Sequence, residues 1–425
     1  MSAVSKVRPE IQTFLETVDE IYNQGDYARG IELISKQLED PEKNQYEVVS
    51  LYAKLGFGHF RLSEDDKALD TFNMCLILSR AIHDRSIEAS ALHYLGTIYT
   101  GIDTQKSTEY LEKALEIRRE LQDKMGESST LNNLGNVYLN VGMYSEALRN
   151  YQESIMLKAE IGAHYPGLAS STINLGEIYA RQGFIDRSIR LNKRALRYAE
   201  LNKSLYPLVG AKLNLVLQYI MNGDFTLAFT TLGEVRLKVE ELGWQNEQAW
   251  LTYYYYSLLY AETNQPLRAR EWFEKVKTMT ETKDPSRKKR LAVLDATLCS
   301  RASQWKQAEK AWEHVKQTAD EDNDFLTQID ARLELAAVKL NQENQSETAI
   351  QLTCDALNLA ERYEILPRAA NTLIQLLHKD RERLRLQYEF LERSLNLVQS
   401  PLEGKVDVNE VRAYLEELSV LLPST

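Results

Sequence analysis

The segment Leu134-Gly135-Asn136-Val137-Tyr138, followed by Ala147, Tyr151 and Ser154, decides the fold, because the chain repeats its pattern at a nearly fixed distance. The next copy consists of Leu175, Gly176 and Tyr179, followed by Ser188, Asn192 and Ala195. A fixed period of about 40 residues is the sequence signature of a solenoid. Solenoids usually present a long curved surface to a partner, so the repeat also directs the search for function to that surface.

A small residue stands at the same place in every copy of the repeat. Nine such residues, here called the anchors, follow one another at intervals of 38 to 41 residues: Gly30, Ala68, Ser107, Ala147, Ser188, Ala228, Ala269, Ala308 and Ala349. A small side chain is needed where two helix backbones come close together. A leucine at an anchor would overpack the contact and cost roughly 1–3 kcal/mol.

Two further features place a helix on each side of a turn in every repeat. Tyrosines precede the anchors by eight or nine residues, at Tyr99, Tyr138, Tyr179, Tyr219 and Tyr260. Such tyrosines suit a half-buried ring with a hydroxyl at the edge of the core. Between tyrosine and anchor, Gly25, Gly142, Gly183 and Gly223 supply the left-handed conformation that ends a helix. Asp26 and Asp224 are placed to cap the second helix.

These features predict an all-α fold, a right-handed α-solenoid of about nine helix–turn–helix repeats. The repeats are expected over residues 10–365, after a short lead at 1–9. A degenerate helix pair and a C-terminal capping helix are expected over residues 366–425, because terminal repeats must shield the end of the stack.

The pattern L-G-x-x-Y followed by A-x-x-x-F/Y-x-x-A resembles the tetratricopeptide repeat (TPR). It occurs as Leu95-Gly96-Tyr99, Leu134-Gly135-Tyr138 and Leu175-Gly176-Tyr179. The unit of about 40 residues is longer than the usual 34, and this long form is similar to LGN/Pins, kinesin light chain and the Rap-like and PlcR-like peptide receptors of bacteria. Because the first repeat begins by about residue 10, we expect neither the effector bundle nor the helix-turn-helix module of the two bacterial families, and we do not expect their output activity.

Bulk composition and motifs exclude several classes of function. The net charge of −11 argues against non-specific nucleic-acid binding, which needs a basic face. The three cysteines, Cys75, Cys299 and Cys354, form no CxxC pair and are expected to be buried small hydrophobes. No P-loop, HExxH or G-x-S-x-G motif occurs, and the histidines lack metal-ligand spacing. We therefore expect a non-enzymatic protein without a cofactor or a metal. The absence of a signal-like or membrane-spanning apolar run favours a cytoplasmic location.

The best candidate for a binding surface is the inner face of the first helix of each repeat, which lines the groove in TPR solenoids. Asn133, Asn174 and Asn214 occupy one position of this helix in three consecutive repeats, and Asn132, Asn136 and Asn140 extend the polar face. An asparagine amide can bind both backbone groups of an extended peptide. The resemblance implies this role, since similar asparagines hold peptides in the related families. The alternative is that these asparagines tie adjacent helices together.

Other side chains are expected to share this groove. Helical spacing places Glu177 and Arg181 on the same side as Asn174, where they could select charge on a ligand or simply pair with each other. In the cluster Trp250–Tyr256, period 3.6 places Tyr253 and Tyr256 on the packed face and leaves Tyr254 and Tyr255 facing the groove. The carboxylate-clamp form of the fold, which grips C-terminal peptides of chaperones, needs paired lysines in the groove. It is excluded, because the corresponding positions hold His93, Asn132 and Ile173.

The sequence therefore predicts a TPR scaffold or adaptor that binds a peptide or disordered protein segment in its concave groove. The alternative is a signalling receptor that responds to a peptide or metabolite and regulates a separate effector. Two basic stretches, residues 287–290 and 379–385, are interpreted as solvated faces rather than as phosphate or nucleic-acid contacts.

Overall fold

The computed structural model describes residues 7–23, 26–162, 167–280, 285–342 and 346–363, together with Ile365 and Ala369. Over these residues the chain is all helical, without strands, as the repeat predicts. The helices are α1 (Pro9–Asn23), α2 (Tyr27–Leu38), α3 (Gln45–Arg61), α4 (Asp65–Ala81), α5 (Arg85–Tyr99), α6 (Thr104–Glu120), α7 (Lys124–Asn140), α8 (Tyr144–Ile161), α9 (Gly167–Arg181), α10 (Ile185–Leu201), α11 (Leu205–Met221), α12 (Phe225–Glu241), α13 (Glu247–Glu262), α14 (Pro266–Met279), α15 (Pro285–Arg301), α16 (Trp305–Glu321), α17 (Phe325–Leu340) and α18 (Ser346–Arg362).

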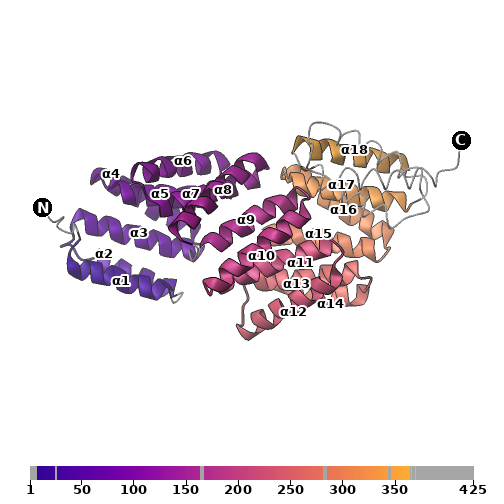
Figure 1. The fold of residues 1–425 in the computed structure, drawn as a ribbon, viewed down its shortest axis with the longest axis horizontal. Coiled ribbons are helices and arrows are strands. Elements are labelled where there is room, and N and C mark those ends of the chain that lie inside the picture. The colour runs from indigo at the N-terminus through magenta and orange to yellow at the C-terminus, as the bar shows by residue number, and fades with distance from the viewer. Residues whose placement is uncertain are drawn as a thin grey trace. The chain divides into compact units, whose positions relative to one another are not determined.

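The chain divides into two compact units, Met1–Gly167 and Leu168–Thr425. Within each unit consecutive helices lie beside one another (Figure 1). Odd-numbered helices are the first helices of the repeats, and even-numbered helices are the second. The degenerate pair and capping helix expected over residues 366–425 lie outside the described residues, apart from Ala369.

All nine anchors are buried. The eight from Ala68 to Ala349 have no exposed surface. A glycine of the first helix often faces the anchor's helix: a Cβ added to Gly135 would lie 2.6 Å from the ring of Tyr151, and one added to Gly96 would lie 2.6 Å from Leu111. These clashes explain why the sequence keeps the positions small.

Serine anchors add a hydrogen bond to the same contact. The hydroxyl of Ser107 donates to the carbonyl of Gly96 at 2.7 Å, and that of Ser188 donates to the carbonyl of Gly176 at 2.6 Å. The tyrosine ladder also matches its prediction, because four of its five members are half-buried and Tyr219 is buried. Steric fit and local polar contacts thus hold each pair in the same arrangement.

The turns within the repeats contain the expected left-handed residues. Gly142, Gly183 and Gly223 have φ of 76°, 90° and 79°, whereas Gly25 lies outside the described residues. Where glycine is lost, another residue takes the same conformation, as Ser303 does with a φ of 55°. Asp26 caps α2 by accepting from the amide of Arg29, but Asp224 makes no such bond to α12, so its predicted cap is wrong. The side chain of Asp224 accepts instead from Asn222.

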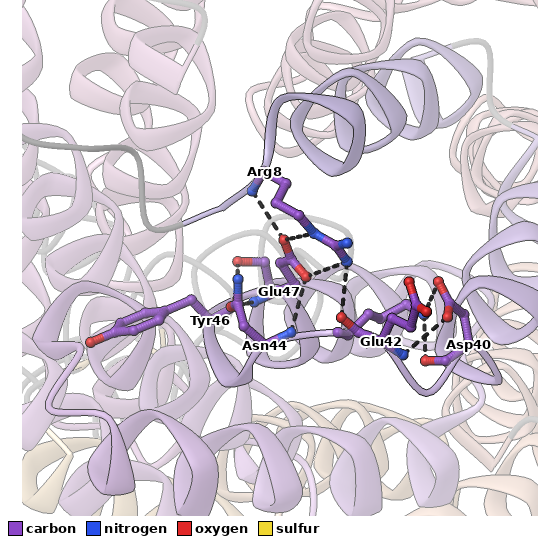
Figure 2. A network of polar contacts seen from close by, with 8 residues as sticks. Arg8, Asp40, Glu42, Asn44, Tyr46 and Glu47 are labelled. Atoms are coloured by element: carbon purple, nitrogen blue, oxygen red, sulfur yellow. Dashed lines mark hydrogen bonds and ion pairs between the residues drawn. The ribbon is translucent and has the colours of Figure 1, made fainter.

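A polar network fixes the start of α3 against the residue that precedes α1 (Figure 2). The fully buried carboxylate of Glu47 accepts from the guanidinium of Arg8 at 2.8 and 2.9 Å. It also accepts from the backbone amide of Asn44, whose side chain in turn caps the helix. Hydrogen bonds from Arg8, outweighing the cost of burial, lower the pKa of Glu47 to about 2. A buried carboxylate is tolerated here because every contact donates to it.

Replacing Ser303 by glycine should stabilise the second unit by about 0.5–1 kcal/mol, because glycine reaches positive φ without a Cβ clash. Denaturant unfolding followed by circular dichroism measures the change. The reverse change, Gly223→Ser, should destabilise by a similar amount. A loss of stability in Ser303→Gly would contradict the assignment of strain to this turn.

Changing Glu47 to glutamine should lower the thermal midpoint of the first unit at neutral pH. The folded pKa lies below the unfolded value, so the charged carboxylate contributes stability above about pH 4.5, and this contribution is lost as the pH falls toward about 2. Glu47→Gln should remove that part of the acid dependence. Glu32, which forms an exposed ion pair with Lys36, provides the control. Glu32→Gln should change the thermal midpoint little. Equal effects of the two substitutions would refute the special role of Glu47.

Candidate peptide-binding face

The first helices contact one another as well as their own partners. In the first unit α3 contacts α5 and α5 contacts α7, and in the second unit α11 contacts α13 and α13 contacts α15. We call the exposed side of these odd-numbered helices the first-helix face of each unit. Asn133, Asn136 and Asn140 belong to the first unit, whereas Asn174, Glu177, Arg181, Asn214, Tyr254 and Tyr255 belong to the second.

Asn133 ties two adjacent helices together, which is what the alternative to groove binding expects. Its half-buried amide donates to the hydroxyl of Thr97 on α5 at 2.7 Å and lies 3.3 Å from Nε2 of His93 on the same helix. The asparagine therefore joins two successive first helices. Its remaining donor and acceptor capacity is smaller than the sequence alone suggests.

A buried polar cluster lies next to this contact and shares His93 with it. The guanidinium of Arg118 on α6 donates to the carbonyl of Gly126 at 2.7 Å, to the hydroxyl of Thr130 and to Nδ1 of His93 at 3.2 Å. Burial, together with the charge of Arg118, lowers the pKa of His93 to about 3. His93 is consequently neutral at physiological pH and accepts a hydrogen bond from the guanidinium. Sequence reasoning considered His93 only as a position of the carboxylate clamp and did not identify this cluster.

Two further asparagines of α7, Asn136 and Asn140, differ from Asn133. Asn136 accepts from the hydroxyl of Tyr151 at 2.6 Å, so it contributes to the contact within its own helix pair. Asn140 ends α7 with an exposed side chain. Of these residues, Asn140 is the most open to solvent.

In the second unit the same repeat position is half-buried in both copies, at Asn174 on α9 and Asn214 on α11. Within the described residues Asn214 makes no hydrogen bond through its side chain, in contrast to Asn133. Glu177 and Arg181 form the pair that their spacing allows, with an oxygen–nitrogen distance of 2.6 Å. Their side chains remain 40% and 26% exposed, so solvent or a ligand can reach both.

The tyrosines of α13 require a correction. Tyr254 is half-buried with its ring 5.2 Å from that of Trp250, but Tyr255 exposes only 7% of its surface, as little as Tyr256. The prediction that Tyr255 lies open in the groove is wrong. The reason is that α13 packs against α11 and α15 in addition to α12 and α14, so little of its surface is open.

The hydroxyls of these tyrosines interact electrostatically with charged residues of neighbouring first helices. Burial raises the pKa of Tyr255, and the charges of Arg290 on α15 and Glu177 on α9 act on it as well. Burial raises the pKa of Tyr254 to about 12, and Arg290 and Asp330 act on that hydroxyl. Side chains from α9, α13, α15 and α17 therefore share one electrostatic environment in the second unit.

Residues 47–120 and 126–200 match the family described as tetratricopeptide repeat. The chain carries tetratricopeptide repeats. Proteins built from such repeats are generally non-enzymatic scaffolds for protein interactions. No curated protein matches the chain in sequence.

Solved structures with similar helix pairs include other TPR proteins, all at low identity. The nearly identical TPR-like repeats of a kinesin light chain-like protein from Podosopora anserina are 18% identical, with a TM-score of 0.38, over 44% of this chain and 92% of that chain. A tetratricopeptide repeat protein from Parabacteroides merdae is 16% identical, with a TM-score of 0.41, over 63% and 92%. A signal transduction ATPase with numerous domains and a TPR sensor, from Pyrococcus horikoshii, is 17% identical, with a TM-score of 0.48, over 63% and 41%. The narrower likeness to LGN/Pins stays a prediction.

The first helices of the second unit also carry an ionic network that was not anticipated from the sequence. Arg301 on α15 donates to Glu262 on α13 at 2.8 Å and to both oxygens of Glu334 on α17 at 2.8 and 3.0 Å. Opposite charges on both sides raise the pKa of Arg301 despite its burial. A signal was present in the sequence, since Arg181, Glu262 and Arg301 each precede an anchor by seven residues.

The basic stretch 287–290 also joins TPR helices. Arg287 and Arg290 both pair with Glu247 on α13, at 2.9 and 3.1 Å, and Lys289 pairs with Asp322 at 2.8 Å. These contacts place three of the four cations of the stretch in ion pairs between helices of the second unit. Residues 379–385 lie outside the described part of the chain. Among the residues that are described, no helix is both long and apolar enough to cross a membrane.

Alanine at Asn133 should lower the free energy of unfolding of the first unit by about 1 kcal/mol, because Thr97 and His93 lose a partner. Alanine at Asn214 should leave the stability nearly unchanged, since its side chain has no partner within the described residues. Denaturant unfolding of the two variants provides the comparison. Equal destabilisation would show that the two asparagines are tied in the same way.

Proposed function

We propose that this TPR protein is a non-enzymatic scaffold whose second unit binds an extended peptide or a disordered protein segment on its first-helix face. One observation carries the proposal. The side chains of Asn214 and Tyr254 are half-buried and that of Tyr255 is buried, yet none of the three makes a hydrogen bond to another described residue. Polar groups that are partly desolvated and unpaired are costly unless a partner completes them.

The chemistry of these groups suits a peptide main chain. The amide of Asn214 offers donors and an acceptor, so it can bind a backbone carbonyl and a backbone N–H regardless of the ligand's sequence. The raised pKa values keep both tyrosines protonated, so each phenol can donate one hydrogen bond to a carbonyl oxygen. An extended chain alternates carbonyl and N–H groups along its edge, which matches such a set of neutral polar groups.

Apolar residues beside these groups provide places for ligand side chains. Leu217 follows Asn214 by three residues, and Leu251 and Leu258 flank Tyr254 at spacings of three and four, so each shares a helix face with its neighbour. All three are only partly buried. Ligand side chains that alternate in direction would reach these leucines while the main chain meets the polar groups.

Charged residues of the same face favour particular ligands. Glu177 and Arg181 pair with each other but stay partly exposed, so a ligand charge can compete for either member. Arg290 acts on both tyrosine hydroxyls and is 48% exposed at its side chain. A ligand with an acidic residue near its contact with Tyr254 would gain from this cation.

The proposal is tested with random linear peptides displayed on phage and selected on the wild-type protein. Selected peptides should bind Asn214→Ala and Tyr255→Phe about tenfold more weakly, because each change removes one hydrogen bond of about 1.4 kcal/mol. Asn174→Ala then tests whether the asparagine of α9 contributes. Binding is measured by fluorescence anisotropy.

The control is Gln152→Ala, which removes an exposed amide from the second helix α8 and should bind as the wild type does. All variants must keep the helical circular dichroism spectrum of the wild type. Failure to enrich any peptide, or unchanged affinity in both Asn214→Ala and Tyr255→Phe, would sink the proposal.

A further inference from the structure

The second helix α10 carries a row of exposed cations that the first-helix face does not use. Arg190, Lys193, Arg194 and Arg197, here called the basic face of α10, follow the spacing of one helix side and are all exposed. The buried residues of α10 are Ser188, Asn192, Ala195 and Ala199. The basic face therefore points away from the packed side of the helix.

No member of the basic face forms an ion pair with a described residue. Arg194 contacts only Tyr198, through a 2.7 Å hydrogen bond to its hydroxyl and a cation–π contact of 5.4 Å. The second helix α6, by contrast, pairs two of its surface cations, Lys113 with Glu109 at 2.5 Å and Arg119 with Glu153 at 2.7 Å. Like charges three and four residues apart destabilise a helix, so this cluster has no stabilising role of its own.

A hollow of about 430 Å³ lies over these side chains. Its lining consists of the four cations together with Tyr198 and Leu201. Leu201 is 56% exposed at the end of the helix, and Tyr198 is half-buried. The surface thus combines concentrated positive charge with a small apolar end.

We propose that the basic face of α10 is a second interaction surface, which binds an acidic segment of a protein partner that ends in an apolar side chain. Carboxylates of the segment would pair with Arg190, Arg194 and Arg197, and the apolar side chain would contact Tyr198 and Leu201. Arginine forms two parallel hydrogen bonds with a carboxylate, which makes it well suited to this ligand. This surface is separate from the first-helix face proposed above to bind a peptide, and the proposal for α10 does not depend on that function.

Size and charge favour a protein segment over a polyanion. Arg190 and Arg197 are seven residues apart, which is roughly 10 Å along a helix, or about three residues of an extended peptide. A nucleic acid or an anionic membrane would bring a much larger negative surface against a protein of net charge −11. A short acidic segment meets the local cations with far less of that repulsion.

The test uses a fluorescent synthetic peptide of about eight residues, made of glutamate and aspartate with one terminal leucine. The full chain should bind it, and binding should weaken as salt is raised. Arg190→Glu with Arg194→Glu should reduce the affinity by about tenfold or more. Lys306→Glu with Lys310→Glu reverses two exposed charges at the same spacing on α16 and should leave the affinity unchanged.

Three further ligands and one further variant complete the experiment. A peptide with glutamine and asparagine in place of the acids should not bind, and Asn214→Ala should bind the acidic peptide as the wild type does. A single-stranded oligothymidine and vesicles containing phosphatidylserine should bind more weakly than the acidic peptide. The proposal is overturned if the α10 double variant keeps full affinity, if the α16 variant loses as much, or if either polyanion binds more tightly through the same arginines.

Discussion

The close approach of two helix backbones within each repeat is the constraint on which the remaining structure depends. It requires a residue such as Ala147 on the second helix and, where the contact is closest, a residue such as Gly135 on the first. Because a small buried residue recurs in each of these helix pairs, equivalent positions of the repeat fall on equivalent parts of the first helices. The repeat thereby determines where Asn133 and Asn214 lie without determining what they contact.

Features that follow from local sterics could be predicted from the sequence. The anchors, the half-buried tyrosines and the left-handed glycines each depend on residues within one helix pair, so their pattern alone was sufficient. Prediction was weaker where two residue types can meet one requirement. Ser303 takes the conformation of Gly223 without being glycine, and Asp224 stands at a cap position without capping.

The candidate site could be located but not described, because its contacts join different repeats. Asn133 and Asn214 look alike in the sequence, yet only Asn133 meets a hydroxyl, that of Thr97 on the preceding first helix. Tyr255 was expected to be open because helical periodicity counts only its own helix, whereas burial depends on α11 and α15 as well. The part of the site that eludes sequence reasoning is the pairing between neighbouring repeats.

Contacts between neighbouring repeats also decide which basic residues are free to bind a ligand. Ion pairing in the structure shows this, whereas composition does not. Arg290 and Arg301 stand in sequences as basic as that of α10, but both are paired with glutamates of neighbouring first helices and serve the stack. Arg190 and Arg197 have no such partner within the described residues. Each lies three or four residues from Lys193 or Arg194 on the same helix, and these like charges repel one another. A protein of net negative charge gains nothing for its own fold from such a row. We therefore attribute this row of cations to the binding of a ligand. The first-helix face suits a peptide chain held by neutral amides and phenols. The basic face of α10 suits a different kind of ligand, an acidic segment.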